Sequence, residues 1–339
     1  MASALSLWLL SSLFLAALSD PAMWGYSCSD IKLTPPGLKS LVAADPAGPI
    51  QIFSVRRHDI RDDYSDNIVF NGNDDLSLSD VLNRKLWDQP LETNGPNVTL
   101  TNYNPEQNCD LDFVIVFFNQ EASKYYKARI TESVENEEDY EMDPNLPRVY
   151  MNQDFCTVIV PITPNPSFEL YSGLKGSARR IFGTGDAAVQ GYNISRIYVY
   201  GPVFTLIPTK DHRVQFYKCS DGPSPVLKAG EDWFVVSSTD AFPGALAVKD
   251  KKISFSLPKQ GIVSMDIRNF NITGGVKVTA TDSGLFKSFS GSGQFDTFKA
   301  KGTSFTIEYQ TEFTQAALAS GAGRGEYFTL HIKPTMKGQ

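Results

Sequence analysis

Histidine and cysteine are scarce in this chain of 339 residues, which contains 3 histidines and 4 cysteines. The histidines, His58, His212 and His331, are scattered, and the chain lacks both a Gly-x-Ser-x-Gly elbow and a His-Glu-x-x-His motif. Those motifs are the usual marks of serine hydrolases and zinc proteases. We therefore predict no catalytic residues. Because His331 alternates with apolar neighbours, we expect it to face solvent from a strand.

The chain also has no excess of positive charge. Its 31 Lys and Arg face 38 Asp and Glu, which gives a net charge of −7. Proteins that bind nucleic acid or anionic membranes need a clustered positive field. The composition therefore predicts neither nucleic acid nor a membrane surface as a partner.

Long apolar runs are missing after the first twenty residues. The run Leu5–Leu18 is uncharged and apolar, and the small residues Ala17 and Ser19 fit a signal-peptidase site. We expect residues 1–19 to be a signal peptide and, because no later run reaches spanning length, no transmembrane anchor. The predicted location is secreted and extracellular.

Three Asn-x-Ser/Thr sequons support a secretory route. They begin at Asn97, Asn193 and Asn271, and each is an acceptor pattern for N-linked glycans in exported proteins. The sequence thus predicts a glycoprotein.

The four cysteines all precede residue 220, so the last third of the chain has none. An even number in an oxidising compartment favours two disulfides, and no close Cys pair indicates a zinc site. We predict that Cys28, Cys109, Cys156 and Cys219 form two disulfides. Three pairings are possible.

Six aspartates gather between two apolar segments of the N-terminal part: Asp59, Asp62, Asp63, Asp66, Asp74 and Asp75. Carboxylates and carbonyls are the ligands that Ca²⁺ prefers, but the spacing does not match an EF-hand. A solvated loop is the main interpretation, with an irregular calcium site as the alternative. No other cofactor is expected.

Short alternating segments dominate the rest of the chain. In Ile253–Phe270, two alternating arms flank the turn residues Pro258 to Gly261, and we interpret the stretch as a β-hairpin. The turn-rich residues 220–225 are the best linker. The predicted fold is mainly β, with an N-terminal disulfide-bonded domain at 20–221 and an antiparallel β-sandwich at 222–339.

The N-terminal domain is predicted to be β-rich, with an α/β start as the alternative. A helical spacing at Leu78–Leu86 lies between strand-like runs at Ile50–Val55 and Cys109–Phe118. The acidic segment Glu132–Asp143 is interpreted as a solvated loop, with a contact segment as the alternative.

A Gly-x-Gly pattern at Gly183–Gly185 matches part of a dinucleotide-binding fingerprint. That fingerprint needs a preceding strand and a following helix. The residues before Gly183 do not read as a clear strand, so we interpret these glycines as structural.

Residues Trp233 to Pro334 resemble a CUB-like domain. The resemblance rests on the Ile253–Phe270 stretch, the valine strand at 276–278, the Asp282-Ser-Gly turn and the closing Gly325–Ile332 strand. It implies an extracellular recognition module of the kind found in secreted nematode CUB-like proteins, some of which are associated with host defence. The paired cysteines and the calcium residues of CUB domains have no clear counterparts here. Residues 49–118 are also faintly similar to the luminal part of vacuolar ATPase accessory subunits.

Two functions remain open at this stage. The first is a non-enzymatic extracellular recognition or assembly module that contacts an unidentified protein or glycan through its loops. The alternative is a secreted hydrolase that uses paired carboxylates of the N-terminal domain, because such pairs leave no sequence motif. The oligomeric state is not predicted.

Overall fold

The computed structural model describes strands in the first 146 residues by their backbone, and most of the chain from residue 147 onward. In that second part the described residues are 147–152, 156–173, 180–186, 189–201, 203–210, 212–219, 225–238, 251–280, 285–309 and 327–335, with side chains at most positions. All regular elements of the described residues are strands. No helix among these residues is long and apolar enough to cross a membrane.

Eight strands of the N-terminal part pair into two four-stranded sheets. One sheet has the order β1 (Met23–Ser27), β8 (Phe113–Phe118), β3 (Gln51–Arg56) and β6 (Leu91–Glu92). The other has the order β2 (Lys39–Val42), β7 (Asn97–Asn102), β4 (Ile68–Asn71) and β5 (Leu76–Ser77). Strands β3 and β8 fall where the apolar runs predicted them. The helix expected at 78–86 lies outside the described residues.

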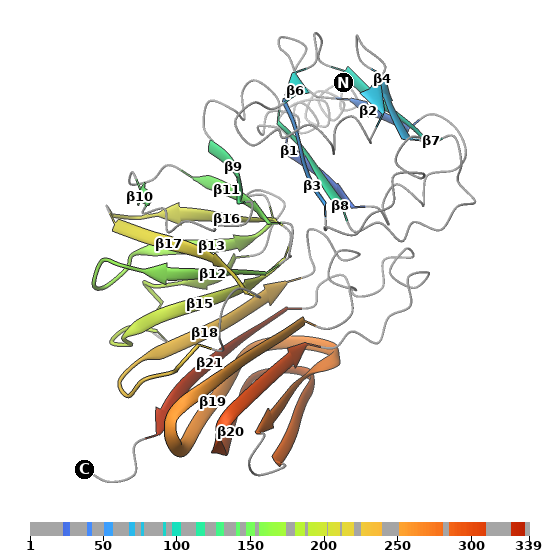
Figure 1. The fold of residues 1–339 in the computed structure, drawn as a ribbon. Coiled ribbons are helices and arrows are strands. Elements are labelled where there is room, and N and C mark those ends of the chain that lie inside the picture. Colours follow the sequence, from blue (N-terminus) through green and yellow to red (C-terminus); the bar gives the residue numbers. More distant parts are fainter. Residues whose placement is uncertain are drawn as a thin grey trace, which may run out of the picture.

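The largest sheet has eight strands, stacked one above another in Figure 1. Its order is β10 (Tyr140–Met142), β17 (His212–Lys218), β12 (Cys156–Pro161), β15 (Ile194–Tyr200), β18 (Asp232–Ser238), β21 (Tyr327–Thr335), β19 (Lys251–Ala280) and β20 (Leu285–Tyr309). All neighbours are antiparallel except β15 and β18, which are parallel. Strands from both sides of the predicted 221/222 domain boundary therefore share this sheet, and the boundary itself stays a prediction.

A five-stranded sheet covers part of one face of the large sheet. Its order is β14 (Arg180–Gly183), β13 (Phe168–Ser172), β16 (Val203–Pro208), β11 (Arg148–Asn152) and β9 (Lys127–Thr131). Rings meet between the two sheets: Tyr150 lies 4.4 Å from Phe216, and Phe182 lies 4.9 Å from Phe234, measured between centroids. Aromatic side chains of this size dominate the energetics of a core. This aromatic layer is the first of two cores.

Every residue of β16 is buried, as its almost unbroken apolar run requires. Its one hydroxyl residue, Thr205, is fully buried and donates a hydrogen bond of 2.8 Å to the carbonyl of Gly173. The hydrogen bond satisfies the polar group that burial removes from water.

Strands β19 and β20 fold back over the opposite face of the large sheet and create the second core. Residues 304–309 of β20 pair with 251–256 on one side and, at 305–309, with 276–280 on the other. Ring contacts join this returning layer to the sheet beneath it: Trp233 lies 5.5 Å from Phe255, and Tyr309 lies 5.3 Å from Phe328. The C-terminal strands are therefore arranged in two layers around an apolar interior.

The hairpin predicted at Ile253–Phe270 is wrong. Its two arms do not pair with each other; residues 251–256 pair with 304–309, and residues 261–272 pair with 291–302. Both arms lie end to end along β20, and Pro258 to Gly261 form an irregularity in one long strand. Alternation shows which face of a strand is apolar but not which strand is its partner.

Candidate functional site

The predicted disulfide cysteines are only partly within the described residues. Cys156, at the start of β12, is bonded to Cys219, directly after β17, and the described residues contain no free cysteine. The two strands are antiparallel neighbours, which brings these ends together. One of the three possible pairings is thereby assigned. Its counterpart, Cys28 with Cys109, lies outside the described residues.

Two of the three sequon asparagines can be located. Asn193 precedes β15, Asn271 lies within β19, and both are exposed. Asn97 begins β7, and its side chain is outside the described part. The six aspartates of the predicted calcium cluster and His58 also lie outside it, so those predictions stay predictions.

The most unusual polar group in the described part is His331, which lies on β21 and is 0% exposed. The sequence predicted a solvent-facing side chain, and that prediction is wrong. Nε2 of His331 lies 2.8 Å from a carboxylate oxygen of Asp232 on β18. Nδ1 lies 3.5 Å from a carboxylate oxygen of Asp266 on β19. We call these three residues the His331 cluster.

Register explains how the cluster forms. β21 lies between β18 and β19, and His331 is directly opposite Asp266 in the ladder. Residues directly opposite in neighbouring strands point to the same face. Asp232 reaches the other nitrogen from the start of β18, where its second oxygen accepts a 2.9 Å hydrogen bond from the backbone N–H of Asn193.

Aromatic rings enclose the imidazole. Tyr192 stacks on one side at 4.4 Å and Phe234 at 4.7 Å, between ring centroids. The Tyr192 hydroxyl accepts a 3.0 Å hydrogen bond from Arg268, whose guanidinium also lies 4.0 Å from Asp266. Lys333 lies 6.0 Å from the Tyr192 ring. The cluster therefore joins β18, β19, β21 and the loop before β15.

The geometry determines what the cluster can do chemically. The two carboxylates contact opposite nitrogens of one ring, so the three side chains do not converge on a common point for a metal ion. Among the described residues no group of three His, Cys, Asp or Glu side chains could hold one. A general base must reach a proton on its substrate, whereas His331 is fully enclosed. In this arrangement the cluster has a structural role, because it links strands β18, β19 and β21.

Sequence reasoning missed this cluster because its members are far apart in the chain. Alternation assigned His331 correctly to the face opposite Leu330 and Ile332, but that face is covered by Tyr192 and Phe234. The assumption that one face of a strand is exposed to solvent fails where both faces are packed against other elements.

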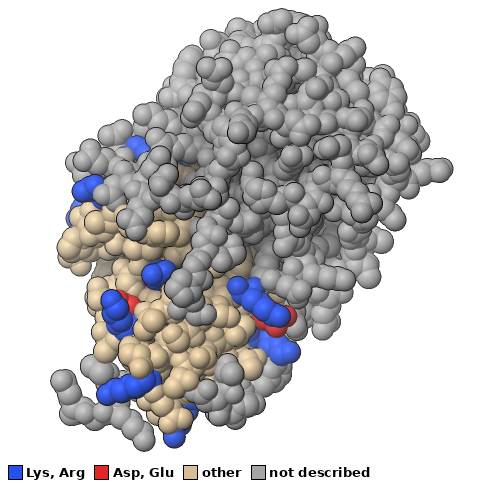
Figure 2. Space-filling model, in the orientation of Figure 1, with Lys and Arg blue, Asp and Glu red and all other residues tan. Residues whose placement is uncertain are grey.

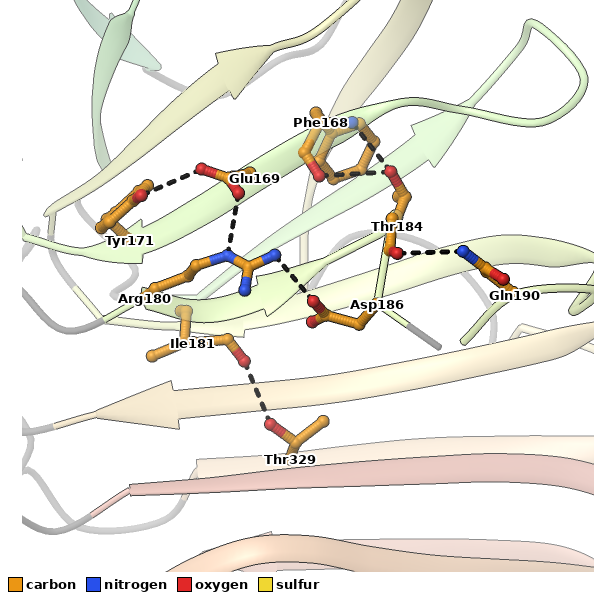
Figure 3. Close-up of polar contacts among 10 residues, drawn as sticks. Phe168, Glu169, Tyr171, Arg180, Ile181, Thr184, Asp186, Gln190 and Thr329 are labelled. Atoms are coloured by element: carbon orange, nitrogen blue, oxygen red, sulfur yellow. Dashed lines mark hydrogen bonds and ion pairs between the residues drawn. The ribbon is translucent and has the colours of Figure 1, made fainter. Parts of the chain in front are cut away.

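The glycine motif begins at Gly183, the last residue of β14, and continues into a turn at 184–186. Thr184 and Asp186 of this turn are labelled in Figure 3. The expectation that no strand precedes Gly183 is therefore wrong, although the next described residues form turns rather than a helix. Thr184 pins the turn, because its backbone N–H donates to the carbonyl of Phe168 at 3.0 Å and its hydroxyl accepts from the backbone N–H of Phe168 at 2.9 Å. Turns in place of the helix that the fingerprint requires favour the structural interpretation of these glycines.

One arginine explains why a glycine occupies position 183. Nε of Arg180 lies 3.1 Å from Glu169, and a terminal guanidinium nitrogen lies 2.8 Å from Asp186. The same nitrogen would be 1.9 Å from a Cβ at Gly183. The Glu169 carboxylate also accepts a 2.9 Å hydrogen bond from Tyr171. Burial raises the pKa of the Tyr171 hydroxyl, and this hydrogen bond adds to the effect.

Two further tyrosines lie on the disulfide-bearing face of the large sheet. Tyr198 and Tyr200 are each 2% exposed, and neither hydroxyl has a partner at ordinary hydrogen-bond geometry within the described part of the chain. Burial raises the pKa of Tyr198 to about 12, and it raises the pKa of Tyr200 further above its usual value. Both hydroxyls stay protonated at neutral pH.

Comparison with known proteins assigns no family. No protein-family model matches the chain, and no curated protein matches it by sequence. Among solved structures, the CUB1-EGF-CUB2 domain of human MASP-1/3 aligns with 92% of this chain and 99% of its own length, at 8% identity and a TM-score of 0.20. A turret protein of Sulfolobus turreted icosahedral virus aligns with 59% of this chain and 98% of its own length, at 8% identity and a TM-score of 0.16. These matches include a CUB-containing fragment, at a similarity too low to define the fold.

Proposed function

We propose that this chain is an exported glycoprotein that acts as a non-enzymatic extracellular recognition or assembly module with a CUB-like C-terminal sandwich. The observation that carries the proposal is the disulfide between Cys156 and Cys219. Disulfides persist in oxidising compartments and are rare in the cytosol. The apolar run of the first residues and the exposed positions of Asn193 and Asn271 support the same route.

The packing of the described part supports a recognition role. Apolar cores line the large sheet on both faces, and the imidazole of His331 is closed to solvent. Such a scaffold offers its loops, its outer faces and its sheet edges for contacts, which is how sandwich domains commonly bind. The hydrolase alternative would need carboxylates of the N-terminal part, whose side chains lie outside the described residues.

Expression of the full chain in cultured eukaryotic cells tests the proposal. We expect the protein in the medium, with a mass above that of the polypeptide that falls after treatment with an N-glycosidase. Single Asn193→Gln and Asn271→Gln variants should each lose one glycan, because both side chains are exposed. Retention in the cytosol without glycans, despite an intact N-terminus, would overturn the proposal.

A further inference from the structure

The C-terminal strands have a positive net charge, although the net charge of the whole chain is −7. Strands β19, β20 and β21 together contain nine Lys and Arg and three Asp and Glu. Figure 2 shows the consequence on one face of the molecule, where the described surface displays several Lys and Arg groups and little Asp or Glu.

Three of these cations, Lys299, Lys301 and Lys333, lie on the same face of the large sheet. Ser264 of β19 is directly opposite Lys299 of β20 on one side and Lys333 of β21 on the other, so the two lysines point to the same face. Their Cα atoms are about 10 Å apart, two strand spacings of roughly 4.8 Å. Lys301 follows Lys299 by two residues on the same face, about 7 Å further along the strand. We call Lys299, Lys301 and Lys333 the basic strip.

The acidic side chains near the strip are already engaged. Asp266 lies on the same face in the next row, but its side chain is 10% exposed and contacts His331 and Arg268. Lys299 and Lys301 are exposed, and neither forms an ion pair within the described part of the chain. The His331 cluster thus removes negative charge from a surface on which Lys299 and Lys301 are exposed and Lys333 is half-buried.

We infer that the basic strip binds a sulfated or carboxylated polysaccharide, and this inference rests on the proposed extracellular function. β20 is the last strand of the sheet order, and within the described part its residues 291–302 pair only with β19, so the strip lies at an end of the sheet that a linear polymer can follow. The lysines are arranged side by side on a sheet face rather than converging on one point. Such an arrangement suits a chain of separated anionic groups better than one small anion.

Other polyanions fit the surface less well. Peripheral membrane binding combines basic residues with inserted apolar ones, but the exposed large apolar side chains of the described part, Ile162 and Val226, lie outside β19 to β21. An acidic polypeptide loses conformational entropy when it is ordered on a surface. A stiffer polysaccharide loses less on binding.

The test uses purified, disulfide-intact full-length protein and heparin as the probe. Affinity is measured by titration calorimetry at several salt concentrations for the parent, for Lys299→Gln with Lys301→Gln, and for a control, Lys228→Gln with Lys252→Gln. The control lysines are also exposed but lie outside the strip, so both variants lose the same charge. Near-ultraviolet circular dichroism verifies that each variant is folded.

We expect the strip variant to bind heparin about tenfold more weakly than the parent. The steepness of the plot of log affinity against log salt should fall by about two, because binding releases fewer counterions when two lysine contacts are lost. The control should keep the parental affinity, and Lys333→Gln alone should show a smaller loss in the same direction.

Three outcomes would overturn the inference: no heparin binding at low salt, equal losses in strip and control variants, or binding of polyglutamate or anionic vesicles as tight as that of heparin. The last outcome would identify an acidic protein or a membrane as the partner. Because the binding test uses purified protein, it is independent of the export test, and failure of either proposal can be recognised separately.

Discussion

Replacement of His331 by alanine should destabilise the protein by about 3 kcal/mol. The imidazole is 0% exposed and contacts two carboxylates whose residues expose only 13% and 10% of their side chains. A hydrogen bond to a charged group contributes about 1.5–3 kcal/mol, and the lost stacking on Tyr192 and Phe234 adds about 0.5–1.5 kcal/mol. Residual solvent contact of the two aspartates keeps the expected loss near the middle of the summed range.

Urea unfolding of the purified protein, followed by fluorescence and circular dichroism, measures this loss. Thr329→Ala on the same strand is the matched control, because it removes one 3.1 Å hydrogen bond to the carbonyl of Ile181 and should cost about 1 kcal/mol. Combining His331→Ala with Asp232→Ala should give a coupling energy of about 1–3 kcal/mol. A loss for His331→Ala no larger than that of the control would refute the structural role of the cluster.

Two smaller effects follow from other contacts. Gly183→Ala should displace Arg180 and weaken its ion pairs with Glu169 and Asp186. Because these groups are more than a third exposed, the loss of stability in urea should stay below about 1 kcal/mol. Gly185→Ala is the control and should leave the stability unchanged, because a Cβ at that position meets open space. Tyr198, whose pKa is raised to about 12 by burial, should resist ionisation in the native state, so stability should be constant up to about pH 10 and fall above it as unfolded tyrosines ionise. Ultraviolet titration of the parent against a Tyr198→Phe variant measures this, and a native Tyr198 that ionises near pH 10 would contradict it.

The strands were the most predictable part of the structure. The apolar runs Ile50–Val55 and Cys109–Phe118 overlap β3 and β8, because short β-branched and aromatic segments have few other stable states. The apolar faces of β19 and β21 also followed from alternation, as the burial of Met265 and Leu330 shows. Local sequence is sufficient for both properties.

Strand partners and the His331 cluster could not be predicted in the same way. Pro258 to Gly261 have turn chemistry, yet the pairing of both flanking arms with β20 is more favourable overall than a local hairpin. Burial of His331 depends on Tyr192 and Phe234, whose positions relative to β21 are fixed by long-range packing. Signals of that kind are spread over more than a hundred residues of chain and leave no local pattern.

Peptide mapping of the purified protein under non-reducing conditions tests the central claim most directly. The account predicts that digestion releases a peptide pair in which Cys156 is linked to Cys219, and that neither residue is alkylated before reduction. Reduction should separate the pair. Alkylation of either cysteine in the unreduced protein, or linkage of either one to Cys28 or Cys109, would contradict this account. Its central claim is that a disulfide joins two neighbouring strands of an exported β protein.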